Sequence, residues 1–177
     1  MPFTGVKLIC GVLSPDDRLW EWALHEMTSR WGEPERVSEV FPFEHTDYYR
    51  DISPVLLRRF VSFKKLRYAG DLALWKKQSC QIEKKSGEKR TVNIDPGYLD
   101  GARLVLASTK DHAHRIYLGD QIFAEVTLRF RFGKWLPFDY TFPDFTSDRY
   151  YSFLDTVRQD WLKEARGGGV IDRQVSD

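Results

Sequence analysis

Residues 6–13 form a nearly continuous apolar run that is followed at once by a signal for the start of a helix. The run is far too short to cross a bilayer, and its lack of alternation is typical of a β-strand buried on both faces. Ser14 occupies a predicted N-cap position, with Pro15 in the first turn and two aspartates behind it. We therefore expect a buried strand that leads directly into an amphipathic helix, which Gly32 ends.

The segments that follow complete a pattern of strand, helix, strand, strand, helix, strand within the first hundred residues. After the first helix, the predicted elements are an extended segment over 36–43, a strand over 56–66, a helix over 71–85 that ends at Gly87, and a short strand over 90–94. Pro42 favours an edge position for the first of these, and Asp95-Pro96-Gly97 predicts a turn. This order is that of the split βαβ unit of ferredoxin-like domains.

The second part of the chain reads as strands joined by tight hairpins and closed by a helix. Strands are predicted over 103–108, 114–118 and 121–132, hairpin loops at Gly119-Asp120 and Gly133-Lys134, and a last helix over 149–166. We therefore expect an α+β fold with a ferredoxin-like βαββαβ core, extended by an antiparallel β-meander and a C-terminal helix. A single domain is predicted over residues 1–166, and residues 167–177 are expected to be a disordered tail.

Composition limits the compartment and the class of the protein. The 177 residues suffice for one well-filled core, since 15% of them are aromatic. Cys10 and Cys80 lie far apart and are predicted to be reduced, packed thiols. Residues 1–5 show no basic region followed by a long apolar stretch, so no signal peptide is predicted. We expect a soluble, cytoplasmic protein that makes no use of a membrane.

Four blocks of sequence carry a family resemblance. They are Asn93-Ile94-Asp95-Pro96-Gly97-Tyr98-Leu99 continuing through 104–110, His114-Arg115-Ile116-Tyr117-Leu118 continuing to 124–128, Phe41-Pro42-Phe43 with Thr46, Tyr48 and Tyr49, and Phe142-Pro143-Asp144-Phe145. In their order along the chain they resemble a bacterial family known as domain of unknown function 4416, over almost the whole chain apart from the tail. The resemblance implies a family without an assigned activity, so no catalytic role is carried over from it.

Positive charge is concentrated in residues 58–90. This segment holds eleven Lys and Arg against three acids, a balance of +8, so the remainder carries −7 to reach the total of +1. Such polarity can concentrate an anionic small molecule or a nucleic acid, whereas an ordinary solvated helix face is the alternative explanation. The candidate anion-binding residues are Arg58, Arg59, Lys64, Lys77, Arg90 and Lys110.

A second candidate site depends on the hairpin at Gly119-Asp120. A two-residue loop there places His114 opposite Glu125 and His112 opposite Thr127 on one face of the sheet. Such a cluster could bind a metal, or His114 could act as a general base held by Glu125; a polar pair at a sheet rim is the alternative. No metal site or cofactor is assigned. The candidate catalytic residues are His114, Glu125, Asp95 and Arg115.

Two further features of the sequence each allow two interpretations. Asp95 either caps the predicted turn or joins a site with its neighbours Asn93, Arg90 and Tyr98. The polar and aromatic connection over 44–54, with His45, Thr46, Tyr48 and Tyr49, is longer than an ordinary hairpin loop. Long connections often carry function, although rings packed beneath the loop explain the same composition.

Several known chemistries lack their motifs. There is no glycine-rich phosphate loop, no CxxC pair and no GxSxG elbow. Phe60-Val61-Ser62-Phe63 matches the end of an RNA-recognition strand motif, but Ile9 stands where its partner strand needs a stacking aromatic. Two hypotheses remain: a pocket for a phosphorylated or nucleotide-like anion, or a protein- or nucleic-acid-interaction module. A concave pocket lined by the basic residues and His114–Glu125 would favour the first, and a flat basic face the second.

Overall fold

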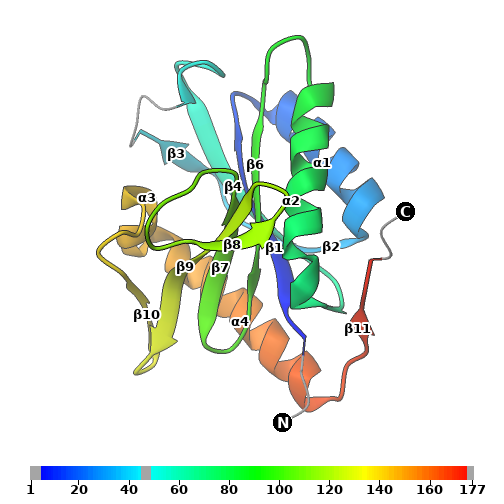
Figure 1. The fold of residues 1–177 in the computed structure, drawn as a ribbon, viewed down its shortest axis with the longest axis vertical. Coiled ribbons are helices and arrows are strands. Elements are labelled where there is room, and N and C mark those ends of the chain that lie inside the picture. Colours follow the sequence, from blue (N-terminus) through cyan, green and yellow to red (C-terminus); the bar gives the residue numbers. More distant parts are fainter. Residues whose placement is uncertain (1–4, 45–48, 175–177) are drawn as a thin grey trace.

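The computed structural model describes residues 5–44 and 49–174 (Figure 1). Its helices and strands are distributed along the whole of that length. They are β1 (Lys7–Ser14), α1 (Asp17–Trp31), β2 (Pro34–Val37), β3 (Phe41–Phe43), β4 (Leu56–Phe63), β5 (Leu66–Arg67), α2 (Leu72–Lys85), β6 (Asn93–Leu99), β7 (Arg103–Ser108), β8 (Ile116–Gly119), β9 (Ile122–Arg131), β10 (Lys134–Pro137), α3 (Pro143–Thr146), α4 (Tyr151–Arg166) and β11 (Ile171–Asp172).

Most of the strands belong to one nine-stranded sheet of order β10-β9-β7-β6-β1-β4-β2, with β3 added to β4 and β8 added to β9. All neighbours in it run antiparallel. The chain therefore has an α+β fold, as predicted. The first half supplies the strands β6-β1-β4-β2, and β6-β7-β9-β10 continues as a meander. Membership of the ferredoxin-like class stays a prediction, as does the single-domain boundary.

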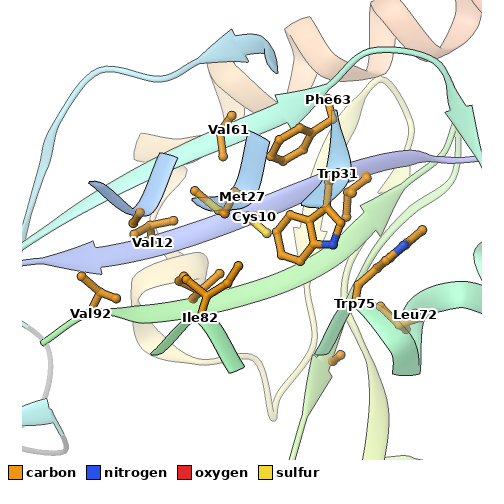
Figure 2. Close-up of a cluster of buried hydrophobic side chains, with 14 of the residues drawn as sticks. Cys10, Val12, Met27, Trp31, Val61, Phe63, Leu72, Trp75, Ile82 and Val92 are labelled. Carbon is orange, nitrogen blue, oxygen red and sulfur yellow. The ribbon is translucent and has the colours of Figure 1, made fainter. Parts of the chain in front are cut away.

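Strand β1 lies at the centre of the molecule and is buried along its full length, as its apolar run predicted. Cys10 and Val12 face one side of the sheet, where they pack with Met27 of α1 and Trp75 of α2 (Figure 2). Ile9 faces the other side and joins the cluster that includes residues of α4. Because side chains alternate across a strand, helices on both sides bury this one completely. Figure 1 shows α2 in front of the sheet and α4 behind it.

The first helix begins two residues later than predicted. Asp16, and not Ser14, is its N-cap, and the Asp16 carboxylate accepts a hydrogen bond of 2.8 Å from the backbone N of Leu19. Ser14 is still the last residue of β1, paired across the sheet with Leu57. The helix ends at Gly32, as expected, with φ at 87°, a conformation that favours glycine.

The predicted turn at Asp95-Pro96-Gly97 is wrong, because β6 passes straight through these residues while paired with β1. Proline is tolerated there because the ladder between β6 and β7 begins only at Gly97 and Leu106. On its β7 side, β6 is therefore unpaired at Pro96, so no neighbouring strand needs the N–H that proline lacks. Gly97 is needed for the close approach of β7, since a Cβ atom would lie 2.2 Å from the carbonyl oxygen of Val105.

Both predicted hairpin loops are displaced by one residue. The first loop is Asp120-Gln121, with φ of 51° and 63°, because Gly119 pairs with Ile122. Two successive left-handed residues are typical of the turn whose twist matches a hairpin. Strand β8 accordingly begins at Ile116 instead of at residue 114. The second loop is formed by residues 132 and 133.

The C-terminal helix α4 is held against the sheet by polar contacts as well as by packing. Trp161 donates from Nε1 to the carbonyl of Gly5 at 2.9 Å. Lys7, fully buried on β1, lies 2.6 Å from a Glu35 oxygen and 2.8 Å from a Glu164 oxygen. These contacts join α4 to both the centre and the edge of the sheet.

Part of the segment that we expected to be a disordered tail has regular structure. Ile171–Asp172 form β11, which pairs in parallel with β5. The predicted loop residues His45, Thr46 and Tyr48 lie outside the described residues. Among the described helices, none combines the length and the apolar character needed to cross a bilayer.

Candidate functional site

A cavity of about 560 Å³ opens where the ladder between β6 and β7 stops. The edge of β6 that β7 leaves unpaired at this point is bonded by side chains of α2 instead of by a strand. Glu83 Oε1 accepts from the backbone N of Ile94 at 2.8 Å, and Lys76 Nζ lies 3.4 Å from the Ile94 carbonyl oxygen. A helix therefore supplies the hydrogen bonds that a neighbouring strand would otherwise make.

The cavity is lined by both layers of the molecule and by the meander. Its polar and charged lining residues are Tyr49, Arg58, Lys76, Cys80, Glu83, Arg90, Asn93, Asp95, Ser108, Thr109, Lys110, His112, His114, Arg115, Glu125, Thr127, Tyr140 and Asp144. Lys76, Cys80 and Glu83 come from α2, while Asp144 comes from α3. The break in the ladder thus brings together side chains from opposite faces of the sheet.

The floor of the cavity is a buried ion pair between Arg58 and Asp144. The Arg58 side chain donates from Nη2 to Asp144 Oδ2 at 3.3 Å, and its Nη1 lies 3.8 Å from Asp95 Oδ2. Burial lowers the pKa of the Arg58 guanidinium, but the carboxylates of Asp144 and Asp95 outweigh it and the pKa is raised. Gly11 makes this arrangement possible, because a Cβ atom there would lie 2.9 Å from Arg58 Nη1. Arg58 is thus already neutralised by protein acids.

Asp95 connects this floor to α2. Its Oδ2 accepts a hydrogen bond of 2.7 Å from Asn93 Nδ2, and its Oδ1 accepts one of 3.3 Å from Lys76 Nζ. Burial lowers the pKa of Lys76, yet Asp95 and Glu83 raise it more, so the ammonium stays charged. Burial, and next the charge of Asp95, raise the pKa of the neighbouring Tyr49 hydroxyl.

His114 and Glu125 form the second centre of the cavity, as predicted, although in a different register. His114 Nε2 lies 2.7 Å from Glu125 Oε2, and Arg115 Nε donates to the same oxygen at 3.0 Å. Thr127 donates to the other carboxylate oxygen at 3.0 Å. The His114 ring stacks on Tyr140 with 3.9 Å between ring centroids. The contact survives the displaced register because both residues lie beyond the short paired length of β8.

The segment between β7 and β8 gives the cavity a positive wall. Arg115 Nη1 donates to Ser108 Oγ and to the Lys110 carbonyl oxygen, both at 2.9 Å, which fixes the guanidinium. Burial, and next the charge of Arg115, lower the pKa of the Lys110 ammonium. Two cations are therefore held near each other on this wall, beside His112 and His114.

The predicted site residues divide into two groups. All four candidate catalytic residues line the cavity, as do Arg58, Arg90 and Lys110 of the candidate anion-binding set. The other three lie elsewhere, each in an ion pair: Arg59 with Asp17, Lys64 with Glu33 at 2.7 Å, and Lys77 with Asp120 at 3.0 Å.

Most of the positive charge of residues 58–90 is matched by acids from other segments. Eight of the eleven basic side chains have a carboxylate within ion-pair distance: Arg58, Arg59, Lys64, Lys65, Lys76, Lys77, Lys85 and Arg90. The charge imbalance seen along the sequence is therefore largely balanced in space, and it gives no support to a flat basic face.

Sequence reasoning missed three charged residues of the cavity. Lys76 and Glu83 flank the apolar stripe of α2, and their positions on its buried side are a signal that could have been used. Asp144, fully buried, gave no local signal, because its partner Arg58 is distant in sequence. Across the described part of the chain, no group of three or more His, Cys, Asp and Glu side chains is arranged to hold a metal ion.

Together, the fold and the cavity define an α+β protein with a charged cavity in a gap of its antiparallel sheet. The chain belongs to the family described as Domain of unknown function (DUF4416), whose model matches residues 4–161. Comparison with the curated proteins and with the solved structures finds no match.

Proposed function

We propose that this protein is an enzyme or ligand-binding protein that holds a small phosphorylated or nucleotide-like anion in the cavity, where His114 can exchange a proton with it. One observation carries the proposal: the His114–Glu125 pair shares a cavity of about 560 Å³ with Arg90, Lys110 and Arg115. A volume of this order suits a small molecule, and convergent polar groups are what such sites use for orientation.

The acid–base part of the proposal rests on how His114 is held. If its Nε2 carries the proton and donates to Glu125, then Nδ1 has a lone pair and can accept a proton. Stacking on Tyr140 fixes the plane of the ring. The Arg115 and Thr127 bonds fix the carboxylate in turn. A histidine oriented by a carboxylate is the arrangement that general acid–base catalysis requires.

The anion-binding part of the proposal rests on the balance of charges. The cavity is lined by five cations (Arg58, Lys76, Arg90, Lys110, Arg115) against four carboxylates (Glu83, Asp95, Glu125, Asp144), a difference of +1 with neutral histidines. Arg58 and Lys76 are buried against Asp144 and Asp95, whereas Lys110 and Arg115 lie together on one wall, where Arg115 is paired with Glu125 at 3.0 Å. Because two cations meet on this wall, the anion is expected beside them. Burial, and next the charge of Arg115, lower the pKa of Lys110, and an anion there would offset the repulsion between the two cations.

A thermal-shift screen tests binding directly. The protein is heated with inorganic phosphate, nucleotides and sugar phosphates at millimolar concentration. A compound present at 100 times its dissociation constant adds about 2.7 kcal/mol, which raises the melting temperature by about 5–10 °C for a chain of this size. If none of these compounds stabilises the protein, the proposal is wrong.

Two lysines from the predicted anion-binding set provide a matched pair of variants. Lys110→Gln removes a charge from the cavity, whereas Lys77→Gln removes one that lies outside it. The first should weaken binding about tenfold, and the second should leave it unchanged. Equal effects of the two would contradict the location of the anion.

His114→Gln separates binding from chemistry. Each compound that binds is incubated with the protein and followed by ³¹P NMR. The variant should still bind but leave unaltered any compound that the unmodified protein converts. Conversion by the variant at the same rate would remove His114 from the mechanism.

A second candidate is a protein-interaction module, which one surface feature favours. Ile116, Tyr117 and Leu118 are consecutive and exposed on β8, and exposed apolar runs often mark docking sites. A partner that binds the unmodified chain but not the Ile116→Ser variant would support this function, in combination with a negative ligand screen.

The proposed compartment is the cytoplasm. Both cysteines are free thiols, with Cys10 buried and Cys80 partly exposed. Unbridged thiols are typical of proteins in reducing surroundings, which supports this part of the proposal.

A further inference from the structure

The part of the cavity around Asp95 can accept hydrogen bonds from a ligand but is unsuited to bind an anion. Four carboxylates line the cavity, and three are almost completely buried: Asp144 at 0% exposure, Glu83 at 8% and Glu125 at 8%. The Asp95 side chain is 26% exposed. A ligand that enters the cavity therefore meets Asp95 more readily than the other acids.

The Asp95 carboxylate can also accept further hydrogen bonds. A carboxylate offers about four lone-pair positions. Two side chains donate to it, Asn93 at 2.7 Å and Lys76 at 3.3 Å, while Arg58 Nη1 lies 3.8 Å away. A carboxylate with lone-pair positions still open attracts a ligand N–H group and repels a phosphate.

The floor beneath Asp95 is polar and incompletely bonded. Within residues 5–44 and 49–174, Arg58 Nε and Asp144 Oδ1 are buried without a hydrogen-bond partner. Leaving such atoms unbonded is unfavourable, so this end of the cavity suits a polar ligand group better than an apolar one.

We infer that the ligand carries an N–H donor, such as an amino group, in addition to its anionic group, and that Asp95 accepts the hydrogen bond from it. The inference rests on the proposed function, because it places the anionic group beside Lys110 and Arg115, on the wall formed by the segment between β7 and β8. The substrate class is then a phosphorylated compound that bears an amino group.

Matched ligand pairs test this class. Glucosamine 6-phosphate is compared with glucose 6-phosphate, and AMP with purine riboside 5′-monophosphate, which lacks both the exocyclic amino group and an N1–H, by isothermal titration calorimetry. In each pair, the amino compound should bind the unmodified protein at least about tenfold more tightly, since a hydrogen bond to a charged group is involved. In Asp95→Asn, the ratio within a pair should fall below about threefold. Asp120→Asn, outside the cavity, is the control and should keep the full ratio.

The outcomes separate the two proposals. Equal affinities within both pairs for the unmodified protein would overturn the inference while the proposed function stands, and this comparison does not depend on how well the variant folds. A preference that persists in Asp95→Asn would overturn the role of Asp95. Absence of binding by all four compounds, while inorganic phosphate still stabilises the protein, would overturn the inference alone. Absence of any stabilisation in the whole thermal-shift screen would refute the proposed function, and the inference with it.

Discussion

Replacing Arg58 by Met should destabilise the protein by about 3–5 kcal/mol, because it leaves Asp144 as a buried carboxylate without its counter-charge. Asp144 is fully buried, and its remaining donor is the hydroxyl of Tyr150, 3.1 Å from Oδ2. Methionine fills much of the volume of the arginine stem, so the loss is mainly electrostatic. For a chain of this size, the melting temperature should fall by about 6–20 °C.

Urea denaturation of a double-mutant cycle measures the interaction. In Arg58→Met/Asp144→Asn the uncompensated charge is absent, so the double variant should be destabilised by at least about 2 kcal/mol less than the sum of the single variants. Arg59→Met is the matched control on the same strand, since its partner Asp17 is 80% exposed, and it should cost no more than about 1 kcal/mol. Additive effects in the cycle, or equal losses for the two arginines, would refute the reasoning.

Three further changes test other parts of the structure. Burial raises the pKa of Glu83, so ionisation of this side chain opposes folding. The free energy of unfolding, measured by urea titration and compared with that of Glu83→Gln, should therefore fall as the pH rises from about 4.5. Gly97→Ala should lower the free energy of unfolding by more than about 2 kcal/mol, because the new Cβ would lie 2.2 Å from the Val105 carbonyl oxygen. Gly167→Ala is its control and should change the free energy of unfolding by less than about 0.5 kcal/mol. Gln121→Gly should raise stability by up to about 1 kcal/mol, since φ is 63° there; no gain in melting temperature would contradict the assigned loop.

The order and type of the main elements could be predicted because each has its own local signal. The apolar run of β1, the spacing of apolar residues in α1 and α2, and the glycine after α1 all act within a few residues. The displaced N-cap shows the limit of such signals. Ser14 has the right chemistry for a cap, but pairing with β4 extends the strand through it and leaves Asp16 as the cap.

The candidate site was predictable only where its residues lie near one another in sequence. His114 and Glu125 come from one hairpin, so an approximate register was enough to place them together. Arg58 and Asp144 come from distant segments that pair only in the folded chain. No periodicity or motif links these positions, and Gly11, which leaves room for the guanidinium and for the Phe60 ring, is explained only by contacts across the sheet.

The error at Asp95-Pro96-Gly97 and the position of the cavity have the same cause. Consecutive even-numbered residues of β6 direct their N–H groups to one edge, and the N–H of Ile94 is bonded there by Glu83 of α2. Pro96 has no N–H to offer at that edge, so β7 gains nothing by extending its ladder past Gly97. The strand instead continues alone beside β9, and the gap it leaves admits Lys76 and exposes Asp95. The residues whose sequence predicted a turn are thus the ones at which the ladder between β6 and β7 stops and the cavity opens.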